Sequence, residues 1–596
     1  MQNNQYFAKP ISIVIVTLAM MGASLTWGAM SGQETIANFT FFCLFLCLML
    51  FLGFTNYLHK PATIFYVLIA GFSLYYIFFI IRGSTVIKGV RYFSLFEDMM
   101  ISMRYAKNFA MGYGLIWNPG GDRVEGFTNL LWTLYMAFWH LFPLSAAKVS
   151  LPIQITGLLL FIASLFLVRK IADDISEGNK YVIIGAVFLT ACYQPLYYWA
   201  LKGVETSVMG FIMLLAVWRL LVCLKHKCFD PWLFVLLGIS ILIRPDVIPL
   251  YVGFSLFLTI AQEENRKKNI VLSVLLLIVT FAGVSLFRWL YFGDVLPNTY
   301  YLKLTGYPLP LRITKGIEVT LNFVKGLSYF LFIVIIVYSF MHIKNKKIQF
   351  FLFLIAIQFV YNIYVGGDAW EWGVANRFLC TIMPLFFILL SSAVYQFIQA
   401  FDSYSGMNAG FKKWCYVVLL LIVVLQLHSG YENNPFKALV RFPAFELDMD
   451  KLGVRTGLAF RDFTKPDAKI AGAAGATAYF SDRYFVDMLG KCDRYIAHQK
   501  SKVQNTAEFL PGHNKWDFSH SIITCQPDIV TYVNRLYLDT REAQQYFVEH
   551  YVRFEFQGFN TDKELIYCRR NSPNINWAMG SVVKKWPHWL VVDPKS

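Results

Sequence analysis

The sequence has little charge for its length. Only 15% of its 596 residues are Asp, Glu, Lys or Arg, whereas 57% are hydrophobic. Soluble domains carry about 25% charged residues, so this composition indicates a membrane protein with some polar mass attached.

A long basic tract is also missing, although the formal net charge is +16. The Lys and Arg residues stand in short clusters between apolar runs, as the positive-inside rule requires, and this distribution argues against nucleic-acid binding. A cleaved signal peptide is not indicated either. The first apolar run, Ile11 to Met30, is longer than the roughly 7–15 residues of a signal-peptide core, so we expect a retained span.

The cysteines form no metal-binding or disulfide-rich pattern. Of ten cysteines, only Cys492, Cys525 and Cys568 fall in the polar C-terminal part. This odd number permits at most one disulfide there, and no C-x-x-C pair indicates a metal.

Long apolar runs dominate the remainder. Because about twenty apolar residues span a bilayer, the sequence predicts roughly thirteen spans, with boundaries uncertain by several residues. They are 10–29, 36–56, 61–82, 149–168, 181–196, 205–223, 230–243, 247–262, 270–290, 321–342, 348–365, 377–398 and 411–429.

The basic clusters predict the orientation of these spans. With a cytoplasmic N terminus, all of them fall on one side, provided that segment 128–143 does not cross the membrane. That segment has about sixteen residues and is rich in Trp, which favours an interfacial helix. Loop 83–148 then lies outside, with surface helices near 98–111 and 128–142. The clusters are Lys60, Arg169 with Lys170 and Lys180, Lys225 with Lys227, Arg266 to Lys268, Lys344 with Lys346 and Lys347, and Lys412 with Lys413.

The outer loop carries two acidic pairs. Glu97 and Asp98 open a helical pattern directly after a span, and Asp122 and Glu125 follow a Gly/Asn/Pro-rich turn. A carboxylate in an outward pocket can have a raised pKa and accept a proton from a sugar hydroxyl. Alternatively, the first pair caps a helix, since Asp is stabilising at an N-terminus.

Cations from several separate segments are predicted at the same face. A phosphate ester at the membrane surface needs such a cluster, because Arg and Lys neutralise the leaving phosphate. Alternatively, each side chain reaches out to lipid headgroups. The cations are Arg104, Lys202, Arg244, Arg288, Lys303 and Arg377.

After about residue 430 the composition becomes that of a soluble domain. Segments 469–476 and 527–533 are typical of buried strands, and 541–550 of a helix, so we expect an outward-facing α/β domain. The spacing of Gly472 and Gly475 is not a phosphate-binding fingerprint, because the third glycine and the Lys-Ser/Thr of a P-loop are absent.

The run E-D-M-M-I-S-M-R-Y-A-K-N-F-A-M-G-Y-G-L-I-W-N-P-G-G-D-R-V-E-G-F-T-N-L-L-W resembles the first outer loop of the GT-C membrane glycosyltransferases. It is most similar to the branch with the mycobacterial terminal β-(1→2)-arabinofuranosyltransferase. The later matches are G-V-E-T at 203–206, R-P-D at 244–246, and the segments 288–303, 365–378, 487–497 and 511–513.

The resemblance implies a GT-C fold with juxtamembrane helices in the first outer loop and a periplasmic α/β domain, and the apolar runs give it about thirteen transmembrane helices. Residues 1–60 would be extra helices, 61–429 the catalytic membrane domain and 430–596 the periplasmic domain. It further implies an inverting transfer of one sugar, arabinofuranose in the nearest relative, from a polyprenyl-phosphate donor to a glycan or glycolipid hydroxyl. The enzyme would sit in the bacterial inner membrane with its active site outside.

The resemblance also implies site residues. An acidic residue of the first pair is the general base, and because this sequence has Glu first, Glu97 and Asp98 both stay candidates. Asp122 and Glu125 match a second acidic position that orients the acceptor or the first helix. Matched positions without an assigned role are Tyr105, Asn129, Glu205, Asp246, Asn298, Asp368 and His513.

Some alternatives stay open at this point. No His/Cys/carboxylate spacing identifies a metal site, and whether Mg²⁺ or Mn²⁺ assists the leaving group is undecided. A lipid-linked-glycan flippase would show inverted repeats and mid-membrane charges, and neither is evident. A non-catalytic scaffold would leave the polar outer loops unexplained.

Overall fold

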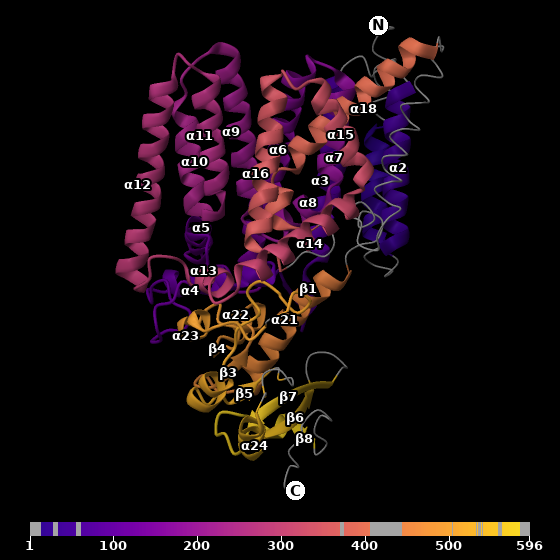
Figure 1. Cartoon of the computed structure of the whole chain (residues 1–596). Coiled ribbons are helices and arrows are strands. Elements are labelled where there is room, and N and C mark those ends of the chain that lie inside the picture. Colours follow the sequence, from indigo (N-terminus) through magenta and orange to yellow (C-terminus); the bar gives the residue numbers. More distant parts are fainter. Residues whose placement is uncertain are drawn as a thin grey trace.

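The computed structural model contains a bundle of long helices and a smaller domain with a β-sheet beneath it (Figure 1). The structure describes residues 14–27, 34–54, 61–369, 375–405, 444–503, 505–531, 533, 538, 540–557 and 563–583. The predicted span 411–429, the cluster Lys412–Lys413, Lys60 and the domain boundary at 430 lie outside these residues.

Six described helices are long and apolar enough to cross a membrane, and eight spans result if each of two bent pairs counts as one. Shorter apolar helices are Val14–Trp27, Ile36–Phe45, Pro231–Ile243 and Pro245–Ala261. The helices of the bundle are α2 (Glu34–Phe54), α3 (Pro61–Arg82), α6 (Ser150–Ser176), α7 (Lys180–Cys192), α8 (Gln194–Leu201), α9 (Thr206–His226), α10 (Pro231–Ile243), α11 (Ile248–Ala261), α12 (Arg266–Phe292), α15 (Tyr329–Met341), α16 (Lys346–Val365) and α18 (Met383–Ser405).

Two predicted spans are broken helices. The span predicted at 181–196 bends by 54° between α7 and α8, where Pro195 in the first turn of α8 cannot continue a helix. The span predicted at 321–342 contains a sharper break. Helix α14 (Leu309–Leu327) meets α15 at 89°, because Ser328 at the junction has a φ of +88°.

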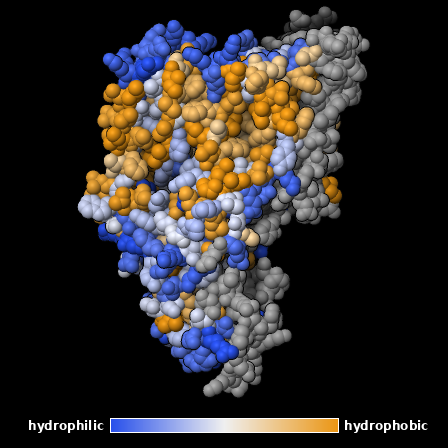
Figure 2. Space-filling model, in the orientation of Figure 1, coloured by the Kyte–Doolittle hydropathy of each residue, from blue (hydrophilic) through white to orange (hydrophobic). Residues whose placement is uncertain are grey.

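The basic loops gather at the end of the bundle that is remote from the C-terminal domain. Lys347 Nζ lies 2.6 Å from Asp174 Oδ2, and Asn265 Nδ2 donates to the carbonyl of Lys227 over 3.0 Å, so these loops adjoin one another. Figure 2 shows this end as a hydrophilic rim above a hydrophobic band. The predicted one-sided distribution of charge is therefore present in the fold.

The opposite end carries the short helices. Strands β1 (Thr85–Ile87) and β2 (Val90–Tyr92) form a hairpin, and α4 (Glu97–Ala110) and α5 (Leu130–His140) follow. With 11 residues α5 is too short to span a bilayer, so segment 128–143 does not cross, as predicted. The other short helices at this end are the 3₁₀ turn Pro245–Val247, α13 (Asn298–Leu304) and α17 (Arg377–Cys380).

The C-terminal part is an α/β domain, which confirms the predicted class. Its sheet has the order β4-β3-β5-β7-β6-β8, with β3 parallel to both β4 and β5 and the other pairs antiparallel. The strands are β3 (Lys469–Gly472), β4 (Tyr484–Asp487), β5 (Ile529–Val530), β6 (Tyr551–Gln557), β7 (Lys563–Arg569) and β8 (Gly580–Val582). The helices are α21 (Ala444–Phe463), α22 (Ala476–Ser481), α23 (Arg494–His498) and α24 (Arg541–His550).

Candidate active site

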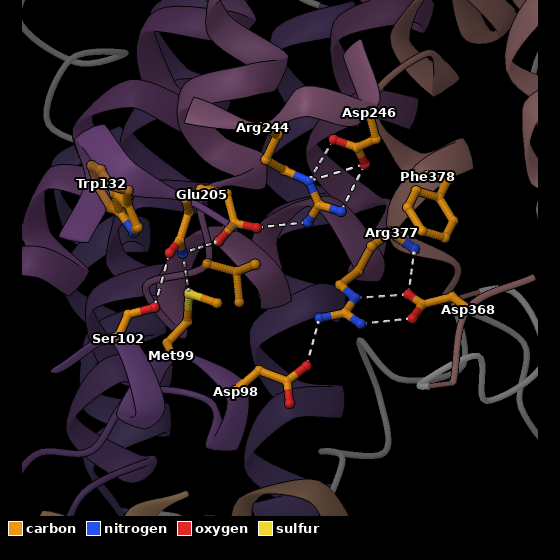
Figure 3. A network of polar contacts seen from close by, with 12 residues as sticks. Asp98, Met99, Ser102, Trp132, Glu205, Arg244, Asp246, Asp368, Arg377 and Phe378 are labelled. Atoms are coloured by element: carbon orange, nitrogen blue, oxygen red, sulfur yellow. Dashed lines mark hydrogen bonds and ion pairs between the residues drawn. The ribbon is translucent and has the colours of Figure 1, made fainter. Parts of the chain in front are cut away.

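Asp98 in the first turn of α4 lies between two cations. Its Oδ2 is 3.0 Å from Arg377 Nη1 and its Oδ1 is 2.9 Å from Lys491 Nζ. Arg377 also donates two parallel hydrogen bonds to Asp368, over 2.8 and 2.7 Å (Figure 3). Burial alone would raise the pKa of Asp98, but Lys491 and Arg377 hold it well below its usual range. The carboxylate is therefore ionised.

Two further basic side chains approach this cluster. Burial and the neighbouring Arg377 lower the pKa of Lys303 on α13 to about 8, and Asp98 acts in the opposite direction. Burial, reinforced by Lys491, lowers the pKa of His513 to about 3. At neutral pH His513 is therefore uncharged beside charged lysines.

A second ion-pair network lies next to the first. Arg244 at the end of α10 contacts Glu205 over 2.6 Å and Asp246 over 2.7 Å. The other oxygen of Glu205 accepts from Asn129 Nδ2 over 3.0 Å, and Asn129 in turn accepts from Ser102 of α4 over 2.9 Å (Figure 3). This chain of contacts links the G-V-E-T and R-P-D motifs to the outer loop.

A small, partly open pocket lies between the two networks, with Arg244, Asp246 and Arg377 in its wall. Arg244 and Arg377 supply its cationic wall, and the apolar side chains of Met209, Met213 and Leu250 supply much of the remainder. Both guanidinium groups already pair with carboxylates, Arg244 with Glu205 and Asp246 and Arg377 with Asp98 and Asp368. An anionic group attached to a hydrocarbon chain would therefore share these cations with the carboxylates.

Glu97 lies in a different environment from its neighbour Asp98. Its Oε2 accepts a 2.7 Å hydrogen bond from the backbone N–H of Ala476 in the C-terminal domain. A Cβ on Gly475 or Gly453 would overlap the Glu97 carboxylate, so both positions require glycine for this close approach. Glu97 therefore holds the C-terminal domain against the outer loop.

Ionisation of Glu97 makes the stability of this contact depend on pH. Burial, with a smaller contribution from Asp450, raises the pKa of Glu97 to about 7, so the folded protein binds a proton there more tightly than the unfolded chain does. The stability that this proton confers is lost as the pH rises through 7. We therefore expect the thermal stability of the wild type to fall between about pH 5 and pH 8.

The Glu97→Gln variant keeps an acceptor for Ala476 but has no ionisation, so its thermal stability should fall less over the same pH range. One pKa unit corresponds to about 1.4 kcal/mol, and thermal unfolding in detergent measures the difference. Some pH dependence should remain, because burial also raises the pKa of Glu125 to about 7. Equal pH profiles of the two proteins would contradict this role of Glu97.

Three of the six predicted phosphate-binding cations lie outside the cluster. Arg104 donates to the carbonyls of Trp117, Ala478 and Arg483. Lys202 forms a buried 2.5 Å ion pair with Asp450 of α21. Arg104 thus joins the outer loop, and Lys202 the end of α8, to the C-terminal domain. Their contact with the donor phosphate stays a prediction.

Arg288, the third of these cations, pairs with Glu125 over 2.7 Å, and both side chains are buried. Glu125 thus fixes the outer loop to the end of α12. Its partner in the predicted acidic pair, Asp122, is exposed. The structure therefore separates Asp122 and Glu125 and brings together only Arg244, Lys303 and Arg377 among the predicted cations.

Two matched motif positions with polar side chains support the backbone. Tyr105 donates to the carbonyl of Val124 over 2.6 Å, which closes the turn of the outer loop. Asn298 Nδ2 donates to the carbonyls of Gly490 and Lys491 over 2.9 Å each. Both residues position neighbouring segments and do not themselves enter the cluster.

No group of three or more His, Cys, Asp and Glu side chains could hold a metal ion within the part of the chain that the structure describes. Both oxygens of Asp98 face cations, an arrangement that does not suit a divalent cation.

Comparisons with known proteins place the fold. A domain of unknown function, DUF8728, matches residues 446–574, and no curated protein sequence matches the chain. The oligosaccharyltransferase of Archaeoglobus fulgidus in its apo form superposes with a TM-score of 0.50 at 9% identity, over 87% of this chain and 76% of that one. The chain has the GT-C fold.

Two other solved structures show similar coverage. ArnT from Cupriavidus metallidurans, bound to undecaprenyl phosphate, has 12% identity and a TM-score of 0.47 over 86% of this chain and 99% of that one. AglB from Archaeoglobus fulgidus, in complex with an inhibitory peptide and a dolichol-phosphate, has 10% identity and a TM-score of 0.47, over 87% of this chain and 76% of that one.

Within this GT-C fold, Lys491 is the site residue that sequence reasoning missed. It lies in segment 487–497, which carries a resemblance to the GT-C family, yet no periodicity or spacing distinguishes it from other lysines. It lies 393 positions from Asp98 in the sequence, so only the docking of the C-terminal domain brings the two together.

Proposed function

We propose that this GT-C protein is an inverting glycosyltransferase. It moves one sugar from a polyprenyl-phosphate donor to a hydroxyl of a cell-envelope glycan or glycolipid. The observation that carries the proposal is the ionised Asp98, held between Arg377 and Lys491 beside a pocket with cationic and apolar walls. The GT-C fold, shared with an oligosaccharyltransferase, supports it.

The donor phosphate has a matching set of cations. Arg244 and Arg377 line the pocket, and Lys303 adjoins Arg377. Charge-assisted hydrogen bonds from guanidinium groups to phosphate are short and strong, and they strengthen further as the phosphate gains charge when it departs. The polyprenyl chain would lie along the apolar wall of the pocket.

The reaction is a single displacement. The acceptor hydroxyl oxygen forms a bond to the anomeric carbon, and the bond from that carbon to the phosphate oxygen breaks. The electron pair of this bond leaves with polyprenyl phosphate, and the hydroxyl proton passes to Asp98. Attack from the face opposite the leaving group inverts the anomeric configuration.

Asp98, rather than Glu97, is assigned as the base. Glu97 faces the backbone of the C-terminal domain, where Gly453 and Gly475 approach it closely, and no acceptor fits between them. Asp98 faces the cations that receive the phosphate. A phosphate that takes over these cations weakens the ion pairs of Asp98, which makes the carboxylate a stronger base at the moment when it is needed.

The orientation follows from the charges. Because basic loops favour the cytoplasm, the end of the bundle with Asp98 and the C-terminal domain faces outward. In a bacterium this is the periplasmic side of the inner membrane.

The sequence resemblance favours arabinofuranose as the transferred sugar, and a pentose or a hexose in the pocket would use the same base and the same phosphate ligands.

Donor turnover by the purified protein tests this proposal. The full chain in detergent is incubated with synthetic polyprenyl-phosphate sugars, arabinofuranose among them, and a glycan acceptor, and release of polyprenyl phosphate is followed. We expect one donor to be consumed. If no donor is consumed and the protein moves a lipid-linked glycan across the membrane of liposomes, the flippase hypothesis replaces the transferase proposal. If neither activity is found, the scaffold hypothesis replaces it.

A further inference from the structure

The loop that carries Lys491 has a fixed backbone. Asp487 at the end of β4 accepts hydrogen bonds from the N–H groups of Leu489 and Cys492 over 3.1 and 2.7 Å, so its carboxylate closes the loop. From outside, Asn298 of the helical part binds the carbonyl oxygens of the same loop. Gly490 has a φ of +78°, which favours glycine. Two parts of the chain thus hold this loop in one conformation.

The fixed loop presents Lys491 to the catalytic carboxylate. The Lys491 side chain is 11% exposed, and its Nζ contacts Asp98 over 2.9 Å. On the other side of Asp98 lies Arg377, at 3.0 Å. The Asp98 carboxylate therefore lies between two cations, and a second anion beside it would meet the same two charges.

The balance of charge favours a second anion here. Lys303, Arg377 and Lys491 are three cations that influence one another, and Asp98 and Asp368 are the two carboxylates that pair with them. A third carboxylate, Asp487, also acts on Lys491, but it accepts two backbone hydrogen bonds and burial raises its pKa. Asp368 is fully engaged by the two parallel hydrogen bonds of Arg377. A phosphate group can therefore bind without leaving the cluster with a large negative excess.

We infer that Lys491 binds the phosphate group of the lipid donor and of the released polyprenyl phosphate, exchanging its contact with Asp98 for one with a phosphate oxygen. This inference rests on the proposed glycosyl transfer and gives the C-terminal domain a part in the active site. The exchange removes one of the two cations from Asp98 just as that carboxylate must accept a proton.

If Lys491 only held the C-terminal domain in place, loss of another lysine that joins the same two parts of the protein would weaken lipid-phosphate binding equally. Lys107 of α4 also pairs with the C-terminal domain, through a 2.6 Å contact with Asp482, whose side chain is 63% exposed. Among the described residues, Lys107 forms no ion pair with Asp98 or Asp368. Lys107→Met is therefore a matched control that removes a lysine between the same two parts of the protein.

The test is binding of undecaprenyl phosphate to the full chain in detergent, measured by microscale thermophoresis. We expect Lys491→Met to weaken binding roughly ten- to hundredfold, the usual effect of losing one hydrogen bond to a charged group. Lys491→Arg should recover much of the loss, and Lys107→Met should bind as the wild type does. Size-exclusion profiles and melting temperatures identify any variant that fails to fold.

The outcomes separate this inference from the proposed function. If the wild type binds undecaprenyl phosphate and a folded Lys491→Met binds it equally well, the inference is wrong and the transferase proposal stands. If Lys107→Met weakens binding as much as Lys491→Met, docking of the domain explains the effect and the inference again fails. If the wild type does not bind the lipid phosphate at all, the proposed function fails as well.

Discussion

We expect Asp98→Asn to lower donor turnover by roughly 10²–10⁴-fold, the usual contribution of a positioned general base. The amide has nearly the same size, but its single oxygen can accept from only one of Arg377 and Lys491, and its NH2 group then faces the other cation. A melting temperature close to that of the wild type shows that the fold persists. Release of polyprenyl phosphate from a donor that the wild type consumes measures the loss. Glu97→Gln is the control and should keep most of the turnover, because Glu97 contacts the backbone of the C-terminal domain.

The same variant should bind undecaprenyl phosphate more tightly than the wild type. In the wild type the Asp98 carboxylate occupies the cations that the phosphate needs, and removal of its charge removes this competition. Slow turnover together with tighter product binding is a combination that general misfolding does not produce. An active Asp98→Asn beside an inactive Glu97→Gln would reverse the assignment of the two carboxylates.

Features with a local cause could be predicted from the sequence. Spans follow from the length of apolar runs, and the end with the basic loops follows from short clusters such as Lys225 and Lys227. The helices near 98–111 and 128–142 appear as α4 and α5. The 89° bend between α14 and α15 was missed because Ser328 at the junction does not by itself signal a break within an apolar stretch.

Features with a distant cause could not be predicted. The sequence shows that Arg104 and Arg377 both lie at the outer face, but not which partner each one meets. Arg104 meets backbone carbonyls, whereas Arg377 meets two carboxylates. Since the C-terminal domain supplies several of these partners, the function of each cation depends on a docking that no local pattern encodes.

This docking depends on the buried ion pair between Lys202 and Asp450, and its disruption should cause the largest loss of stability. Both side chains are almost inaccessible to solvent. Removal of one partner of a buried pair leaves an uncompensated charge and costs about 3–5 kcal/mol, so we expect Lys202→Met to melt at a clearly lower temperature. Lys88→Met is the control, because it breaks the exposed pair with Asp462, and exposed pairs contribute little.

The pH dependence and a double variant test the cause of this loss. Burial raises the pKa of Asp450 even with Lys202 present, so without the lysine the folded protein should bind a proton at Asp450 more tightly still. Stability gained from that proton is present at low pH and lost as the pH rises. Lys202→Met should therefore be less impaired at pH 5 than at pH 8.

Adding Asp450→Leu should restore most of the stability at both pH values, because apolar replacement of a whole buried pair is often neutral. A double variant as unstable as Lys202→Met would show that packing of the lysine stem, and not the stranded charge, stabilises this contact.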